Sequence, residues 1–525
     1  MTVRSSHWKN NTDLRRMAHE VALHTPAPNQ APVIFFNAST RLSGMSLNAA
    51  FNLLTAWSLH LQGVPVVNFI CSRGMTQCVL ATNRINVLKA PPCAECISQS
   101  RSAYHQGDNH WFNYHLDPDL DKALIDLKVD VLSGFTYQGV PLGRLALPSI
   151  RWILRRHNLL DDAGAQVIFR AYICSAWNIK QQFEQLIDEV RPQSVVVFNG
   201  MQYPEATARW VAEKQGLKVF SHEVGMQPYS AFFTSGDATA YPLPIPEEFQ
   251  LSESQNQTLD AYLSKRFKGN FSMAGVQFWP EMSSLDANFI QFSKNFKQVV
   301  PVFTNVIFDT SQPHANVVFS DMFEWLDLVL DIAKAHPETL FVIRAHPDEA
   351  RSGKASEESV ADWADRRHVS ALSNVVFISP EKFFSSYEMI QCAKFVMIYN
   401  STIGMEASIM GVPVLSAGKA RFTQLDTVFF PKTQAAYLSQ AEAFLNADQI
   451  EVPKAHRENA RRFLYFQLFR SSLPFEEFLE EDQVWRGYVR LRKFGWQALL
   501  PANSNTLQTI ANGILHHADF LLPES

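Results

Sequence analysis

The chain has 525 residues, of which 46% are apolar and 18% are charged, a composition typical of a globular protein and a length too great for one hydrophobic core. Its formal net charge of −5 argues against a nucleic-acid-binding protein. No apolar run approaches the ~18–20 residues that span a bilayer, and the polar start lacks the apolar core of a signal peptide, so we expect a cytoplasmic protein.

The first half of the chain predicts a doubly wound α/β domain that follows a polar extension over residues 1–31. Helical stretches separate short apolar runs, and the longest of these stretches covers 163–190. The expected strands are 32–37, 65–71, 194–198 and 217–221. Strand, helix and strand in succession form the βαβ unit of a parallel sheet. We place this N-terminal Rossmann-like domain at residues 32–280.

A second α/β domain is expected after a break in the helical pattern between residues 268 and 296. Its predicted strands are 298–304, 339–343, 375–378, 395–399 and 412–416. We place this domain at 281–450 and a helical tail at 451–525. The expected fold class is therefore α/β of the GT-B type, in which two Rossmann-like domains face a central cleft.

Polar turns follow two of the predicted strands in the second domain. One strand stops at Arg344-Ala345-His346-Pro347, and another stops at Asn400-Ser401-Thr402, which leads into a helical stretch. Adjacent parallel strands that end in polar turns build the ligand crevice of an open α/β sheet. The free N–H groups of a helix that begins near Ser401 suit a phosphate. These turns predict a site for a nucleotide diphosphate or a nucleotide-sugar.

Four of the six cysteines fall in one short region. They are Cys71, Cys78, Cys93 and Cys96. The last two have the spacing of metal ligands, but tetrahedral zinc usually takes two such pairs and the first pair is too widely spaced. We favour small buried thiols plus a surface pair, with a structural zinc site as the alternative.

A series of short motifs runs through the second half over about residues 298–425. They are Thr304-Asn305 with Asp309, Ile343–Pro347, Asn400–Ala407, Gly411–Val414, Gly418 and Phe422. In these motifs and their order, the second half resembles the bacterial capsule polysaccharide biosynthesis glycosyltransferases, whose best-known members transfer Kdo from CMP-Kdo. The first half matches more loosely, through Phe198-Asn199-Gly200 and through His222–Gly225. Val224 stands where the family often has a second acid, which leaves the identity of the acid–base group open.

The resemblance implies a donor site in the second domain. His346 would donate a hydrogen bond to the leaving phosphate from a turn that Pro347 fixes. Ser401 and Thr402 would bind phosphate oxygens, and Gly404 would allow close backbone approach. The remaining expected donor-binding residues are Arg344 and Asn400, with Glu406 on the ribose hydroxyls. For most of these residues a capping or salt-bridge role is the alternative.

The resemblance also implies catalytic and acceptor-binding residues. Glu223 would face the cleft as a general base or nucleophile. Asp309 lies in the first loop of the second domain, where a loop cap is the alternative to a catalytic role. The expected acceptor contacts are Thr40, Arg41, Gly44, Asn199 and Gly200. No Asp-x-Asp metal motif stands out, so we expect a metal-independent enzyme without a cofactor.

The leading hypothesis is a glycosyltransferase that moves a sugar from a nucleotide-activated donor to a capsular polysaccharide or a lipid-linked acceptor. The alternatives are a polyol-phosphate transferase, a nucleotide-sugar epimerase, and a carbohydrate-binding subunit without catalytic activity. The basic, aromatic tail is expected to pack its rings on the domain. Peripheral contact with the cytoplasmic face of the inner membrane, or with a polysaccharide assembly complex, is the other interpretation.

Overall fold

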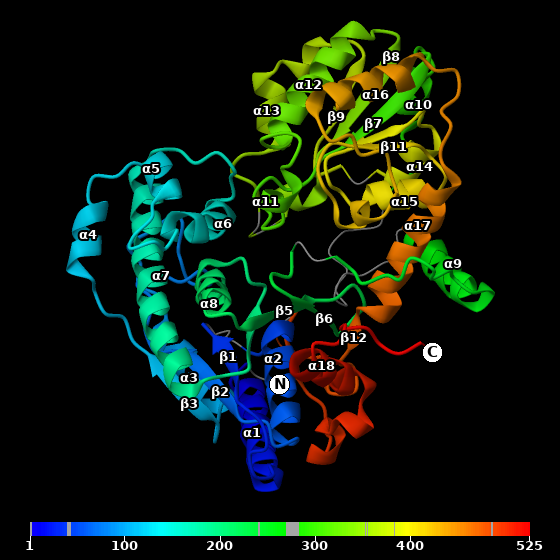
Figure 1. The fold of residues 1–525 in the computed structure, drawn as a ribbon. Helices are drawn as coiled ribbons and strands as arrows, with labels where there is room; N and C mark the ends of the chain where they lie inside the picture. Colours follow the sequence, from blue (N-terminus) through cyan, green and yellow to red (C-terminus); the bar gives the residue numbers. More distant parts are fainter. Residues whose placement is uncertain are drawn as a thin grey trace.

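Two α/β units make up the protein, one above the other in Figure 1. The computed structural model describes residues 3–38, 44–239, 242–268, 283–351, 353, 355–382, 384–482, 484 and 487–524. In the figure, the upper unit holds the sheet that begins with β7, and the lower unit holds the sheet built around β1. Measured against the length and apolarity that crossing a membrane requires, every helix in the described ranges falls short.

The sheet of the first unit has the strand order β12-β6-β5-β4-β1-β2-β3. Its parallel strands are β1 (Val33–Asn37), β2 (Val66–Cys71), β3 (Asp108–Phe112), β4 (Ser194–Phe198) and β5 (Lys218–Val224). Strand β6 (Ser230–Ser235) runs antiparallel to β5, and β12 (Leu473–Pro474) runs antiparallel to β6. The four predicted strands are confirmed, whereas the sequence did not predict β3 and β6.

Helices cover both faces of this sheet. They are α1 (Val3–His24), α2 (Leu47–His60), α3 (Cys93–Ala103), α4 (Pro118–Leu124), α5 (Val129–Gly134), α6 (Leu142–Leu154), α7 (Ala163–Val190) and α8 (Tyr203–Lys214). Alternate side chains of β1 enter two separate cores: Phe35 packs with α1 and α2, whereas Phe36 packs with α6 and α7. Burial on both faces explains the continuous apolar runs of these strands.

The second sheet is parallel throughout and has the order β11-β10-β7-β8-β9. Its strands are β7 (Gln298–Phe303), β8 (Thr339–Arg344), β9 (Val375–Ile378), β10 (Val396–Ile398) and β11 (Val414–Ser416). Its helices are α9 (Glu253–Arg266), α10 (Ala287–Ser293), α11 (Gln312–Ala315), α12 (Met322–Ala335), α13 (Val360–Arg366), α14 (Ser386–Gln391), α15 (Ile403–Ile409), α16 (Gln434–Asn446) and α17 (Lys454–Tyr465). All five predicted strands of this half are present.

The C-terminal segment leaves the second unit along α17 and returns to the first (Figure 1). The expected helical tail is wrong in part, because after α17 the chain forms β12, the hairpin of β13 (Leu479–Glu481) and β14 (Val489–Leu491), and helix α18 (Asn505–His516). Leu473 and Ile510 are buried in the same core as β1. The expected packing of aromatic side chains is confirmed for Phe463 and Phe466, each 1% exposed.

The two units meet at a cavity of about 520 Å³ that is lined from both sides. Met226 and Thr239 line it from the first unit, and the loops after β7, β8 and β10 line it from the second. Two doubly wound α/β units on either side of a cleft form the GT-B arrangement that the sequence predicted.

Candidate functional site

The register of the second sheet gathers the predicted donor residues at one edge. Phe303 at the end of β7 pairs with Arg344 of β8 and with Ile398 of β10. Because these strands are parallel, the turns that follow them meet at their carboxyl ends. The predicted residues that line the cavity are Asp309, Arg344, His346, Pro347, Asn400, Ser401, Thr402 and Glu406.

Arg344 is a buried cation in the cavity wall. Only 4% of the residue is exposed, and its Nη1 atom is buried without a hydrogen-bond partner among the described residues. None of the ion pairs formed by the described residues includes this guanidinium. Burial lowers the pKa of Arg344 to about 10. An unpaired buried charge is costly, so an anion that enters the cavity would be strongly attracted to Arg344.

His346 follows β8 and presents a defined tautomer. Its Nδ1 accepts a hydrogen bond from the backbone N–H of Asp348 at 3.1 Å. Burial lowers the pKa of His346, and this effect outweighs the opposing charges of Asp348 and Asp309. The neutral imidazole therefore carries its proton on Nε2. His346 caps the short η1 helix (Pro347–Ala350) and also has one N–H group to donate to a ligand.

The turn after β10 leaves two hydroxyl groups uncommitted. Asn305 Nδ2 donates to Asn400 Oδ1 at 2.6 Å and fixes the start of this turn. Thr402 is the N-cap of α15 but makes no side-chain capping bond, and none of the described residues hydrogen-bonds to the hydroxyl of Ser401. The simple N-cap alternative is therefore not seen for either side chain.

Gly404 has a packing role. Gly404 is not among the described residues that line the cavity. A Cβ at this position would lie 2.3 Å from Ile398 Cδ1. The glycine thus lets α15 pack closely on β10, and its close approach to a ligand stays a prediction.

Glu406 lines the cavity, but both of its carboxylate oxygens are already bound. Arg266 contacts Oε1 through Nε at 2.7 Å and Nη2 at 2.6 Å, and the Tyr387 hydroxyl donates to Oε2 at 2.6 Å. The carboxylate raises the pKa of Arg266 despite the opposing effect of burial. Glu406 is therefore one partner of a buried ion pair that ties α9 to α15, and its contact with a ribose stays a prediction.

Asp309 is held in a loop turn at the cavity edge. Its Oδ1 accepts hydrogen bonds from the backbone N–H of Ser311 at 2.9 Å and from the Ser311 hydroxyl at 2.5 Å. The alternative of a loop cap thus describes its contacts, and a catalytic role stays a prediction.

Those predicted residues of the first unit that the structure describes do not line this cavity. Asn48 Nδ2 donates to Glu223 Oε1 at 2.8 Å, and Asn199 Nδ2 donates to Oε2 at 3.0 Å. Gly44 packs against Tyr488 of the C-terminal segment. The carboxylate of Glu223 is turned toward the start of α2, so it is not among the described lining residues. Thr40 and Arg41 lie outside the described residues.

The turn at the end of β4 has a left-handed backbone, with φ of 56° at Asn199 and 81° at Gly200. A Cβ at Gly200 would lie 2.8 Å from Ser221 Oγ and 3.1 Å from Asp237 Cα. The Asn199 carbonyl accepts a hydrogen bond from Ala238 N at 2.8 Å. Asn199 and Gly200 therefore hold the loop after β6 in place, and their contact with an acceptor stays a prediction.

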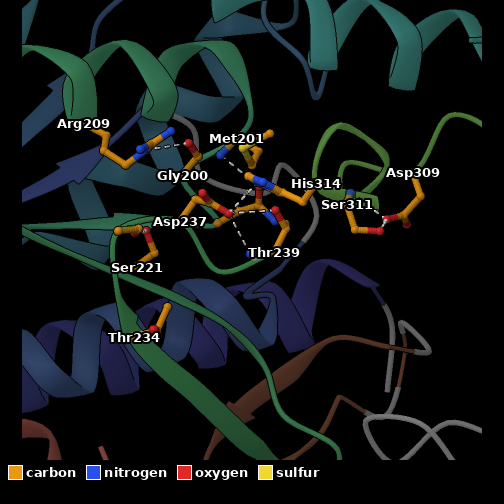
Figure 2. A network of polar contacts seen from close by, with 12 residues as sticks. Gly200, Met201, Arg209, Ser221, Thr234, Asp237, Thr239, Asp309, Ser311 and His314 are labelled. Carbon is orange, nitrogen blue, oxygen red and sulfur yellow. Dashed lines mark hydrogen bonds and ion pairs between the residues drawn. The ribbon is translucent and has the colours of Figure 1, made fainter. Parts of the chain in front are cut away.

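Figure 2 shows what this loop presents to the second unit, a pair that the sequence analysis missed. His314 Nε2 lies 3.3 Å from Asp237 Oδ1 without hydrogen-bonding to it. The same oxygen accepts hydrogen bonds from Thr239 N at 3.0 Å and from Thr239 Oγ1 at 2.7 Å. Burial alone would raise the pKa of Asp237, but His314 and Thr239 together lower it. His314 and Thr239 both line the cavity.

The four cysteines of the alternative zinc site are not gathered into a metal-binding group in the described part of the chain. None of the four cysteines forms a disulfide, and within the described ranges no three His, Cys, Asp or Glu side chains are placed to hold a metal ion. Burial raises the pKa of Cys71 and of Cys78 to about 12, so these two thiols keep their protons at neutral pH.

Comparisons with known proteins gave distant similarities. No family model matches the chain. Protein FixF of Sinorhizobium fredii (strain NBRC 101917 / NGR234) is 27% identical over 281 residues, which are 50% of this chain and 60% of that protein. The chain therefore spans less than two thirds of this curated relative.

Solved structures with similarity include two transferases and an epimerase. The Thermosulfurimonas dismutans KpsC β-Kdo 2,4 transferase matches with a TM-score of 0.35 and 11% identity, over 53% of this chain and 80% of that one. The KpsC β-Kdo 2,7 transferase of the same organism matches with a TM-score of 0.32 and 12% identity, over 61% of this chain and 87% of that one. UDP-GlcNAc 2-epimerase from Neisseria meningitidis matches with a TM-score of 0.25 and 12% identity, over 83% of this chain and 98% of that one. With similarities this low, the fold assignment rests on the topology of this chain.

Proposed function

We propose that the protein is a glycosyltransferase that uses a nucleotide-activated sugar, CMP-Kdo or a similar donor, and a capsular polysaccharide or glycolipid acceptor. The donor's nucleotide phosphate would lie in the cavity against the carboxyl edge of the second sheet. The acceptor would enter from the first unit. The sequence motifs and the residues that line the cavity both support this assignment.

The observation that carries the proposal is the unpaired guanidinium of Arg344. A charge that is 4% exposed and has no carboxylate partner among the described residues would be stabilised by a bound phosphate. His346 offers a neutral Nε2–H donor on the same wall, and the Ser401 and Thr402 hydroxyls lie on the turn after the neighbouring strand β10.

These groups suit the chemistry of glycosyl transfer. When the bond between the sugar and the phosphate breaks, negative charge grows on the phosphate oxygen that leaves. Donors fixed in a cavity stabilise this charge without reorganising. Arg344 would contribute charge, and His346 would contribute a hydrogen bond that strengthens as the charge develops.

The test is nucleotide binding, measured by thermal shift and calorimetry with CMP, CDP, UDP, GDP and TDP. We expect one nucleotide class to raise the melting temperature of the wild-type protein, and we expect Arg344→Met and His346→Ala to lose that shift. Arg366→Met is the matched control, because it removes an exposed guanidinium from α13 and should keep the shift. Binding of no nucleotide, or an unchanged shift in Arg344→Met, would contradict the proposal.

The products then separate the transferase from its alternatives. A transferase releases nucleotide from its sugar donor, whereas an epimerase yields an altered sugar without any acceptor. A carbohydrate-binding subunit would bind nucleotide and release none at high protein concentration. Product analysis by mass spectrometry after incubation with CMP-Kdo or UDP-GlcNAc distinguishes these outcomes.

A further inference from the structure

We propose that His314 is the acid–base group of the transfer reaction and that Asp237 is its positioning residue. The inference rests on the proposed function and names a residue pair that its motifs do not contain. The two residues come from different units: Asp237 follows β6, and His314 lies in α11. Figure 2 shows them facing one another beside Thr239.

We infer a role for each ring nitrogen of His314 from what lies near it. Nε2 lies 3.3 Å from the Asp237 carboxylate, whose side chain is only 11% exposed. Nε2 makes no hydrogen bond to the described residues, so its contact with Asp237 is electrostatic. A proton on Nε2, the nitrogen nearer the carboxylate, leaves the lone pair on Nδ1. None of the described residues hydrogen-bonds to that nitrogen, and 35% of the His314 side chain is exposed, in a residue that lines the cavity.

Asp237 is itself held in place before any ligand arrives. Thr239 donates two hydrogen bonds to its Oδ1, and the backbone of this loop is fixed by Asn199 and by the close approach of Gly200. A buried carboxylate that orients an imidazole and stabilises its protonated form is a general device of acid–base catalysis. The left-handed turn at Asn199 and Gly200 therefore contributes to the placement of His314.

The other predicted bases are less suited to accept a proton. Both oxygens of Glu223 already accept amide hydrogen bonds, Asp309 accepts two bonds from Ser311, and Nδ1 of His346 is occupied by Asp348 N. Asp348 also faces Arg351, with 3.7 Å between its Oδ1 and Nη1. On the described cavity wall, His314 combines an Nδ1 that none of the described residues hydrogen-bonds with a buried carboxylate 3.3 Å from its other ring nitrogen.

The step balances with these groups alone. The acceptor hydroxyl, or water in its absence, forms a bond to the anomeric carbon and gives its proton to Nδ1 of His314. The bond between that carbon and the phosphate oxygen breaks, and its electron pair leaves on the phosphate, where His346 donates a hydrogen bond. The imidazolium returns its proton to solvent after the products leave.

The experiment measures nucleotide release from CMP-Kdo and from UDP-GlcNAc with water as acceptor, in wild type, His314→Ala and Asp237→Asn. General acid–base catalysis contributes roughly 10²–10⁴-fold, so we expect a loss of that size in His314→Ala. Imidazole added to the buffer should restore part of it. We expect a smaller loss in Asp237→Asn. The matched control is His110→Ala, since His110 forms a surface pair with Asp108 at 3.5 Å and its removal should leave the rate unchanged.

The possible results distinguish failure of the role proposed for His314 and Asp237 from failure of the proposed function. Wild-type rates in His314→Ala, with nucleotide binding intact, would overturn the role of His314 and leave the donor site standing. A loss that imidazole does not restore, accompanied by a lower melting temperature or weaker nucleotide binding, would show that the pair only joins the two units and would also overturn the inference. Failure of the wild-type protein to bind nucleotide, or to release it from either donor, would remove the proposed function and the inference together.

Discussion

The two sheets end in polar edges that differ in how their charges are satisfied. At the edge of the first unit, Glu223 accepts hydrogen bonds from Asn48 and Asn199. At the edge of the second unit, Arg344 is buried with its Nη1 unbonded among the described residues. A satisfied edge is stable without a ligand, whereas an unsatisfied edge gains stability when an anion binds. We therefore expect the second edge, and not the first, to control nucleotide affinity.

A second comparison can be made within the cavity wall, between two buried arginines. Arg266 is bound through two nitrogens to Glu406, while Arg344 has no such partner in the described part of the chain. We predict that Arg266→Met lowers the free energy of unfolding by about 3–5 kcal/mol, because it leaves the Glu406 carboxylate buried and uncompensated. Thermal unfolding measures this change.

Arg344→Met should have the opposite sign in the free protein, since it removes an uncompensated charge. The double variant Arg266→Met/Glu406→Met is the control, and it should be less destabilised than Arg266→Met alone. A melting temperature that falls equally in Arg266→Met and Arg344→Met would show that the two guanidinium groups are equally well compensated.

The packing of α15 on β10 supplies the next largest effect. We predict that Gly404→Ala lowers stability by roughly 1–3 kcal/mol, because the added methyl would lie 2.3 Å from Ile398 Cδ1. Ile398→Val removes that atom and should restore part of the loss in the double variant. Gly134→Ala, where nothing lies within 4 Å, is the matched control. Equal melting temperatures for both single variants would contradict the packing role.

A buried carboxyl group in the first unit predicts a dependence of stability on pH. Burial raises the pKa of Glu205 to about 8, above its ordinary value of 4.5. The folded state therefore holds a proton that the unfolded state has lost, so stability falls as pH rises from about 4.5 to about 8.

Glu205→Gln lacks this titration. We expect its melting temperature to exceed that of the wild type by an increment that grows over this pH range, with a gain on the order of 2 °C or more above pH 8. Thermal scans at pH 5, 6.5 and 8.5 measure it. An increment that is constant with pH would show that Glu205 does not titrate in this range.

The smallest effect is expected for a change at Glu223, at the polar edge of the first sheet. Glu223→Gln keeps the side-chain volume and replaces a carboxylate that does not line the described cavity wall. Nucleotide affinity should stay within about twofold of wild type by calorimetry, since this change is far below the 1.4 kcal/mol of a tenfold effect. A loss comparable to that in Arg344→Met would mean that both edges bind the donor.

Most strands, and the edge that holds Arg344 and His346, could be predicted because apolar runs end there in polar turns. Strands β3 and β6 were missed because Asp108 to Phe112 and Ser230 to Ser235 are short and partly polar, and their pairing depends on distant segments. The packing role of Gly404 was not predicted, because only the neighbouring strand shows what a Cβ would meet.

The contact between Asp237 and His314 was beyond sequence analysis for a related reason. The residues stand 77 positions apart by their numbering in loops without a motif, and they meet only because the two units face each other. The ion pair between Arg266 and Glu406 was not predicted for the same reason. The two residues are far apart in the sequence, and no motif links α9 to α15. Local periodicity predicts elements, but it carries no information on which loops meet across a cleft.

The return of the C-terminal segment sets an order for folding during synthesis. Leu473, Phe475 and Ile510 complete the core that contains Phe35, so the ribosome makes the whole second unit before the first can close. Until then, the edge of β6 that pairs with β12 and the apolar face beneath α18 are exposed. Nascent chains are therefore expected to need protection from aggregation on the first unit for longer than on the second.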